Sequence, residues 1–277
     1  MLLYHFRISM KPVSEPDGFG SIDPVTGRQW RRDAWLRTYF SERRQFTHRG
    51  NEYVFIPLDG VHLPRPLLGG HIARAVTVPE HTPPSEGFEP TEHSSWRGSV
   101  IIVDPTGHDD GQKILFEKRT DIGNPPSVMD SLAKQVRIDD NPRPFDVKIF
   151  PIVQESSFWH FAEQHDFQIQ TLVFDVAPPN MFGDKDDFSD ELRRLRKKNN
   201  VSRVRSTLSS DGVLDVKQGN IREIVDYTEK GVGTIKATTT GKHRYNSREH
   251  AKHDKLDTEQ RSPDFWVRLG IWLRERY

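Results

Sequence analysis

The most regular pattern of apolar and polar positions lies between residues 168 and 240. Helical spacing of apolar side chains predicts two helices there, one from Ser189 to Asn199 and one from Asn220 to Gly231. Strand-like apolar stretches occupy four further ranges, 169–176, 201–208, 213–216 and 234–239. The resulting order of strand, helix, strand, strand, helix, strand is that of a split βαβ unit, as in ferredoxin-like domains.

The first 154 residues contain a similar but longer series of elements. Helices are expected at 31–43 and 126–136, and strands at 2–9, 52–58, 71–78, 99–104, 112–118 and 145–153. Residues 79–97, rich in Pro, Glu and Ser, are expected to form a mobile loop. We therefore predict an α+β fold of two ferredoxin-like (split βαβ) units, of which the first is decorated.

This order of elements divides the chain into four parts. They are an N-terminal α+β domain (1–154), a connecting helix (155–167), a ferredoxin-like domain (168–240), and a basic tail with a C-terminal helix (241–277). In the last part Trp266, Leu269 and Leu273 have helical spacing, which predicts an apolar stripe that packs on the core or on a partner.

Charge is distributed unevenly along the chain. The 277 residues have 40 Lys and Arg against 40 Asp and Glu, yet residues 191–256 carry 16 basic and 8 acidic residues. This excess predicts an anion-binding surface, the alternative being a solvated face neutralised by acidic neighbours. The absence of cysteine excludes disulfides and Cys-type zinc sites. No stretch has transmembrane length and the start lacks a signal-peptide pattern, so we expect a cytoplasmic protein without membrane contacts.

The predicted anion-binding surface lies on the sheet of the 168–240 unit. Strand alternation places Arg203, Arg205 and Lys236 on the face away from the helices, where hydroxyl side chains accompany them. Cations among hydroxyls suit phosphate contacts, and the lack of aromatic side chains at these positions argues against base stacking. With the basic residues of the preceding helix and of the tail, the predicted nucleic-acid-binding residues are Arg193, Arg194, Arg196, Lys197, Lys198, Arg203, Arg205, Lys236, Lys242, Arg244 and Arg248.

Catalytic chemistry is not specified by any motif. His5, in a strand between aromatic neighbours, is a candidate general base, with a structural role as the alternative. His250 and His253 are spaced to share a helix face and bind a metal, or they belong to a basic loop. Clustered carboxylates at 184–187 and 139–140 are weaker candidates for a divalent metal. We therefore assign no catalytic residue, metal or cofactor, and nuclease activity is the expectation if the chain is an enzyme.

Two resemblances bear on function. The tandem split βαβ order resembles that of the CRISPR repeat-processing endonucleases, which fold as paired ferredoxin-like domains and cut RNA without metal. Pro178-Pro179-Asn180, residues 227–233 and Tyr245-Asn246-Ser247 are similar to an uncharacterised bacterial family encoded beside phage-defence genes. The resemblances imply a nucleic-acid-binding component of a prokaryotic antiviral or mobile-element system, with RNA or DNA as its partner. The alternatives are a ferredoxin-like nuclease, or a non-catalytic scaffold that binds a protein partner or a second copy.

Overall fold

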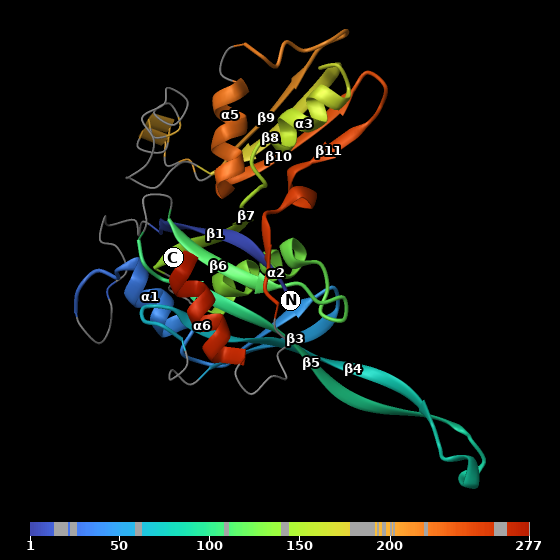
Figure 1. The fold of residues 1–277 in the computed structure, drawn as a ribbon. Helices are drawn as coiled ribbons and strands as arrows, with labels where there is room; N and C mark the ends of the chain where they lie inside the picture. Colours follow the sequence, from blue (N-terminus) through green and yellow to red (C-terminus); the bar gives the residue numbers. More distant parts are fainter. Residues whose placement is uncertain are drawn as a thin grey trace.

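Two antiparallel sheets organise the computed structural model of this chain (Figure 1). The structure describes residues 1–13, 22, 27–58, 63–107, 111–139, 144–177, 192, 194, 195, 198, 199, 201, 203–218, 221–257 and 265–276. Every strand pairing within these residues is antiparallel. None of the helices in the described residues is both long and apolar enough to cross a membrane.

The larger sheet has the strand order β12-β1-β6-β5-β4-β3-β2 and curls into a half-barrel. Its strands are β1 (Leu2–Pro12), β2 (Arg44–His48), β3 (Asn51–Pro57), β4 (Leu68–His81), β5 (Pro90–Asp104), β6 (Gln112–Glu117), β7 (Phe145–Pro151) and β12 (His253–Lys255). Strand β6 pairs along one edge of β1, whereas β12 and then β7 pair with successive lengths of β1. Strand β1 therefore pairs with three strands, although in the strand order it lies next to β12 at one edge of the sheet.

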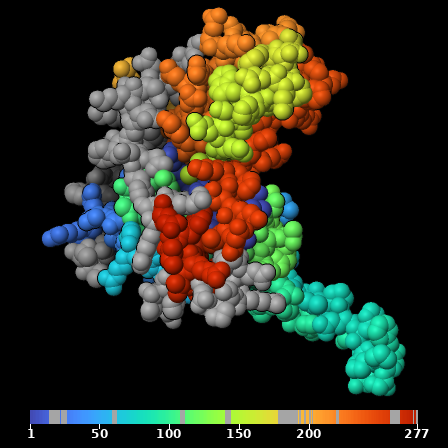
Figure 2. All heavy atoms as spheres, in the orientation of Figure 1, coloured from blue at the N-terminus to red at the C-terminus, as the bar shows by residue number. Residues whose placement is uncertain are grey.

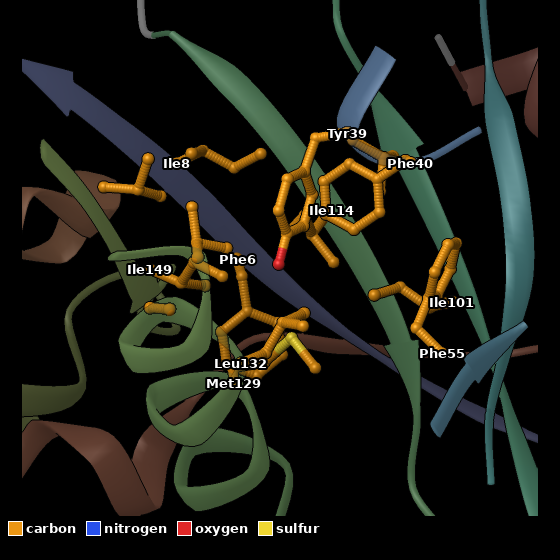
Figure 3. Packing of buried hydrophobic residues seen from close by; sticks show 14 of the residues in the cluster. Phe6, Ile8, Tyr39, Phe40, Phe55, Ile101, Ile114, Met129, Leu132 and Ile149 are labelled. Atoms are coloured by element: carbon orange, nitrogen blue, oxygen red, sulfur yellow. The ribbon is translucent and has the colours of Figure 1, made fainter. Parts of the chain in front are cut away.

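Both faces of β1 are covered, although the alternation of apolar and polar side chains along it predicts a half-buried strand. On one side Phe6 and Ile8 pack with residues of α1 (Arg32–Tyr39) and α2 (Pro125–Asp139). Figure 3 shows Met129 and Leu132 of α2 in this cluster. On the other side Leu3 packs with α6 (Phe265–Arg276). The apolar stripe predicted for the C-terminal helix is thus buried within the chain, through Phe265, Leu269 and Leu273.

The smaller sheet has the strand order β11-β10-β8-β9. Its strands are β8 (Ile169–Val176), β9 (Val204–Ser209), β10 (Gly233–Thr239) and β11 (Arg244–Asn246). Helices α3 (Ser157–Gln164) and α5 (Ile221–Tyr227) contribute to a core with the apolar side chains of one sheet face. We call this the covered face.

One segment near the C-terminus belongs to both sheets. Strand β11 pairs in the smaller sheet, the short helix η3 (Ser247–His250) follows it, and β12 then pairs with β1. Between the sheets this segment exchanges backbone hydrogen bonds with residues that follow β7, from the Gln154 N–H to the His250 oxygen and from the Lys252 N–H to the Ile152 oxygen. The segment therefore connects the two sheets by main-chain pairing.

The prediction of two ferredoxin-like units is wrong. A split βαβ unit places its third strand in parallel beside its first, whereas the only neighbours of β8 in the described sheet are the antiparallel β9 and β10. The expected third strand at 213–216 is not a strand. Val216 is buried and Leu214 packs against the same core, whereas Val213 is exposed. The alternating pattern therefore reflects the burial of Leu214 and Val216 and not the pairing of a strand.

The loop expected at 79–97 is also absent as such. Strands β4 and β5 pair continuously through it, from the pair of Leu68 with Val103 to the pair of His81 with Pro90. A single 3-10 turn, η1 (Pro84–Glu86), closes the hairpin. The prolines that suggested a loop lie at the end of the strands and in this turn, where a missing backbone N–H disturbs no pairing inside the sheet.

Candidate nucleic-acid interface

The second face of the smaller sheet carries polar side chains. Its members, grouped by the pairing register, are Thr171, Val173, Asp175, Arg205, Thr207, Ser209, Thr234, Lys236, Thr238, Arg244 and Asn246, and we call them the open face. The alternation predicted from the sequence is confirmed, since Ile235 and Ala237 are buried in the core while Lys236 between them is exposed. No aromatic side chain occurs among these residues.

Three exposed cations form a diagonal across the open face. Arg205 of β9 lies opposite Asp175, which in turn lies opposite Thr234, two residues before Lys236. Lys236 of β10 lies opposite Asn246, two residues after Arg244 of β11. With about 4.8 Å between strands and about 3.4 Å per residue, the diagonal from Arg205 to Arg244 is about 20 Å long. A linear polyanion that crosses the sheet along this diagonal meets a cation on three of its four strands.

These three side chains differ from other basic residues nearby in their bonding. Among the described residues, Arg205, Lys236 and Arg244 have neither a side-chain hydrogen bond nor an ion pair. Their charges are therefore available to a ligand. Lys242, at the turn between β10 and β11, is likewise exposed, with a left-handed backbone φ of 64°.

Arg203 is not available in the same way. Its Nε and Nη2 both donate to the carboxylate of Asp175, in a bidentate ion pair on the open face. The hydrogen bonds to Asp175 raise the pKa of Arg203, with a smaller contribution from the carboxylate's charge. Asp175 is the single carboxylate among the open-face residues, and Arg203 neutralises it. The remaining net charge of the open face is therefore positive and comes from the diagonal cations.

Arg248, also predicted to contact nucleic acid, instead connects two parts of the chain. Its Nη2 forms an ion pair with Asp130 and donates to the Pro126 carbonyl oxygen at 3.2 Å, both on α2. Its charge is thus neutralised within the protein.

The predicted helical cations fall elsewhere. Arg194 and Lys198 are exposed, and Leu192 of the same segment packs in the core of the covered face. This segment therefore lies on the side of the sheet opposite the diagonal. Arg193, Arg196 and Lys197 lie outside the described residues.

The candidate metal ligands are not brought together. His250 is in η3 and stacks on Tyr245, whereas His253 is in β12 and stacks on Tyr4, so the two do not share a helix face. Asp139 accepts hydrogen bonds from Tyr39 and Gln135. Asp140 and residues 184–187 lie outside the described residues, within which no group of three or more His, Asp or Glu is placed to hold a metal.

His5, the candidate general base, is enclosed at the junction of β12 and β7. Its Nε2 lies 3.0 Å from Asp254 Oδ2, and its side chain is 8% exposed. Desolvation by burial lowers the pKa of His5, although the charge and hydrogen bond of Asp254 oppose the change. A neutral imidazole at neutral pH suits a base, but this burial favours the structural alternative, in which the pair holds β12 against β1.

Sequence reasoning missed a stacked aromatic group at the turn between β10 and β11. The rings of His165 and His243 stack with centroids 4.3 Å apart, and Phe161 contacts both His165 and Tyr245. Only the aromatic side chain of Tyr245 indicated a strand here, and three residues are too few for alternation to identify one.

Comparison with known proteins gives no match, since no family model, curated protein or solved structure is significantly similar to this chain. The candidate interface therefore depends on the geometry described above.

Proposed function

We propose that this chain binds single-stranded nucleic acid through its phosphate backbone, along the diagonal of Arg205, Lys236 and Arg244. The observation that supports this proposal is the alignment of three unpaired, exposed cations on one sheet face. Phosphate groups repeat along a nucleic-acid strand, so an extended strand can satisfy cations on successive β-strands at once.

The chemistry of the open face favours contacts to the backbone over reading of bases. Threonine and serine hydroxyls surround the cations, and hydroxyls donate to phosphate oxygens without regard to sequence. Base-specific sheet-face binders use aromatic stacking, for which the open face has no side chain. We therefore expect weak dependence on base sequence and strong dependence on salt concentration.

The decisive experiment measures affinity for a labelled single-stranded oligonucleotide as a function of salt. Three phosphate contacts predict a slope of log affinity against log salt of about −2 for a single strand. The variant Arg205→Gln/Lys236→Gln/Arg244→Gln removes these charges from exposed positions. We expect its slope to be near zero and its affinity at low salt to fall by more than tenfold.

A matched control removes the same number of charges from the other side of the sheet. Arg194, Lys198 and Arg222 are exposed, with Arg222 on α5 of the covered side. The variant Arg194→Gln/Lys198→Gln/Arg222→Gln should retain most of the affinity and the slope. Equal losses in the two variants would show that net charge, and not the open face, governs binding. RNA and DNA of the same sequence should be compared, since a backbone-level contact predicts binding to both.

A further inference from the structure

Strands β4 and β5 extend beyond the larger sheet as a two-stranded ribbon, residues 75–96. Pairing of β4 with β3 ends at Arg74, and pairing of β5 with β6 begins only at Ile101. Beyond these limits β4 and β5 pair, among the described residues, only with each other, from the pair of Ala75 with Trp96 to the pair of His81 with Pro90. Figures 1 and 2 show the ribbon as a finger that projects away from the rest of the molecule.

Large apolar side chains are exposed at both ends of this ribbon. Trp96 is 56% exposed at its base and Phe88 is 59% exposed at its tip. Phe88 stacks on His81, with ring centroids 4.5 Å apart. By strand alternation Trp96, Ser94 and Glu92 face the same side as His81, so one face carries aromatic rings at its ends and polar groups between them. An isolated ribbon with exposed aromatic rings is typical of a binding element rather than a self-sufficient fold.

The ribbon is acidic. Its glutamates are Glu80, Glu86, Glu89 and Glu92, and it contains no Lys or Arg from 75 to 96. Glu92 lies on the face of Trp96, whereas Glu80 lies on the other face, 3.2 Å from His93 Nδ1. It also contains Pro79, Pro83, Pro84 and Pro90, which lack a backbone N–H. Charged residues and prolines at exposed strand edges oppose pairing with a further strand. The ribbon is therefore suited to contact a partner through a face and not by extending a sheet.

The open face has the complementary character. It carries the diagonal of Arg205, Lys236 and Arg244 among hydroxyl groups, with its one carboxylate already paired to Arg203. In Figure 1 the ribbon points away from the smaller sheet, at the other end of the molecule. A ribbon in this position does not meet the open face of its own chain, so a contact between these surfaces joins two copies.

We propose that the ribbon of one copy docks on the open face of a second copy, with Glu92 and the tip glutamates Glu86 and Glu89 against the diagonal cations. The two surfaces differ, so the contact is heterologous and repeats from copy to copy, as a ring or an open chain. Self-association of this kind does not require nucleic acid. It uses the face proposed for nucleic-acid binding, so a polynucleotide and the ribbon compete for one surface.

Site-directed cross-linking tests the contact directly, because the chain contains no cysteine. One copy carries Ser94→Cys on the ribbon, and a second copy, distinguished by a size tag, carries Thr207→Cys on the open face. We expect a cross-linked pair under mild oxidation in nuclease-treated protein. The matched control replaces Thr207→Cys by Arg222→Cys, on exposed α5, and should give less than a tenth of that yield. Equal yields from both pairs, or none from the first, would overturn the proposal.

Charge reversal provides an independent test by light scattering. Arg205→Glu/Lys236→Glu/Arg244→Glu should weaken self-association at least tenfold, and so should Glu86→Lys/Glu89→Lys/Glu92→Lys. Mixing the two variants should restore association between them, which a loss of folding would not do. A wild-type protein that stays monomeric at high concentration, or a mixture that fails to associate, contradicts the docking.

The ribbon variant also separates the two proposals. Its open face is unchanged, so it should bind single-stranded nucleic acid at least as tightly as the wild-type chain. Loss of self-association with retained nucleic-acid binding in this variant supports both proposals. A wild-type chain that self-associates but does not bind nucleic acid would leave only the docking of copies.

Discussion

The guanidinium of Arg248 forms an ion pair with Asp130, a residue 118 positions earlier in the chain. The pair joins the segment after β11 to helix α2 and so connects the two sheets through side chains as well as main chain. The side chains of Arg248 and Asp130 are 32% and 40% exposed, so solvent screens the attraction. We expect Arg248→Ala to lower the free energy of unfolding by about 1 kcal/mol, including the lost bond to Pro126.

Urea unfolding measures this effect, and a second ion pair provides the control. Lys255 and Asp257 lie 3.3 Å apart with both side chains largely exposed. Asp257→Ala should change the unfolding free energy by less than about 0.5 kcal/mol. A cycle with Asp130→Asn should give a coupling energy with Arg248 of about 0.5 kcal/mol or more, and additive effects would contradict the pairing.

Glu229 should make stability depend on pH at mildly acidic values. Burial raises the pKa of Glu229 above its usual 4.5, although its bonds from the backbone N–H groups of Ser156 and Phe158 oppose the change. The folded state therefore holds this proton more tightly than the unfolded chain. Its contribution to stability is present below pH 4.5 and is lost as the pH rises through the folded pKa. Glu229→Gln should remove this decline, which urea midpoints at several pH values measure, and an unchanged decline would reject the assignment.

His5 acts in the opposite direction. Burial lowers the pKa of His5 below 6.5, so stability is fully present above pH 6.5 and is lost as the pH falls through the folded pKa. The carboxylate of Asp254 raises the pKa of His5 against that desolvation. Asp254→Asn should therefore lower the pKa of His5 further. An NMR titration of the His5 ring in both proteins tests this, and a higher pKa in the variant would disprove the account.

Gly231 is required by both backbone conformation and space. Its φ is +79°, and a Cβ there would lie 3.0 Å from Ile152 Cγ1 and 3.2 Å from Arg7 Cβ. Gly50 has a similar φ of +78° with nothing within 4 Å, so Gly50→Ala measures the backbone strain alone. We expect about 1 kcal/mol for Gly50→Ala and at least about 1 kcal/mol more for Gly231→Ala, measured by thermal or urea unfolding. Equal effects of the two substitutions on the free energy of unfolding would show that Ile152 and Arg7 move to accommodate the added methyl group without loss of stability.

Local periodicity predicted most individual elements but not how they pair. The strands at 169–176 and 234–239 and the helices at 31–43 and 126–136 have counterparts in the structure, because their apolar spacing reflects a face that is buried. The ferredoxin-like prediction was wrong because element order does not determine strand neighbours. Strand β9 pairs with β8 across a long connection, and nothing in the alternation of either strand specifies that partner.

The same limit applies to the candidate site. Alternation correctly oriented Lys236 and Arg205, since orientation is a property of one strand. Whether a cation is available depends on residues distant in sequence. Asp175 neutralises Arg203 from 28 residues away and Asp130 binds Arg248 from 118 away, which only the folded register establishes. The diagonal likewise requires the pairing of β11 with β10, and the three-residue β11 gives no periodic signal.

The position of β12 beside β1 has a consequence for how the chain folds during synthesis. Residues 2–4 are translated about 250 residues before their partners, residues 253–255. The apolar layer around Leu3 is likewise incomplete until Phe265 and Leu269 have been translated. The edge of β1 at residues 2–4 and the apolar layer around Leu3 therefore stay uncovered until residues 253–269 have been made, after the last strand of the smaller sheet, β11. Closure of the larger sheet becomes a late, non-local step, which slows folding and lengthens the period of susceptibility to aggregation.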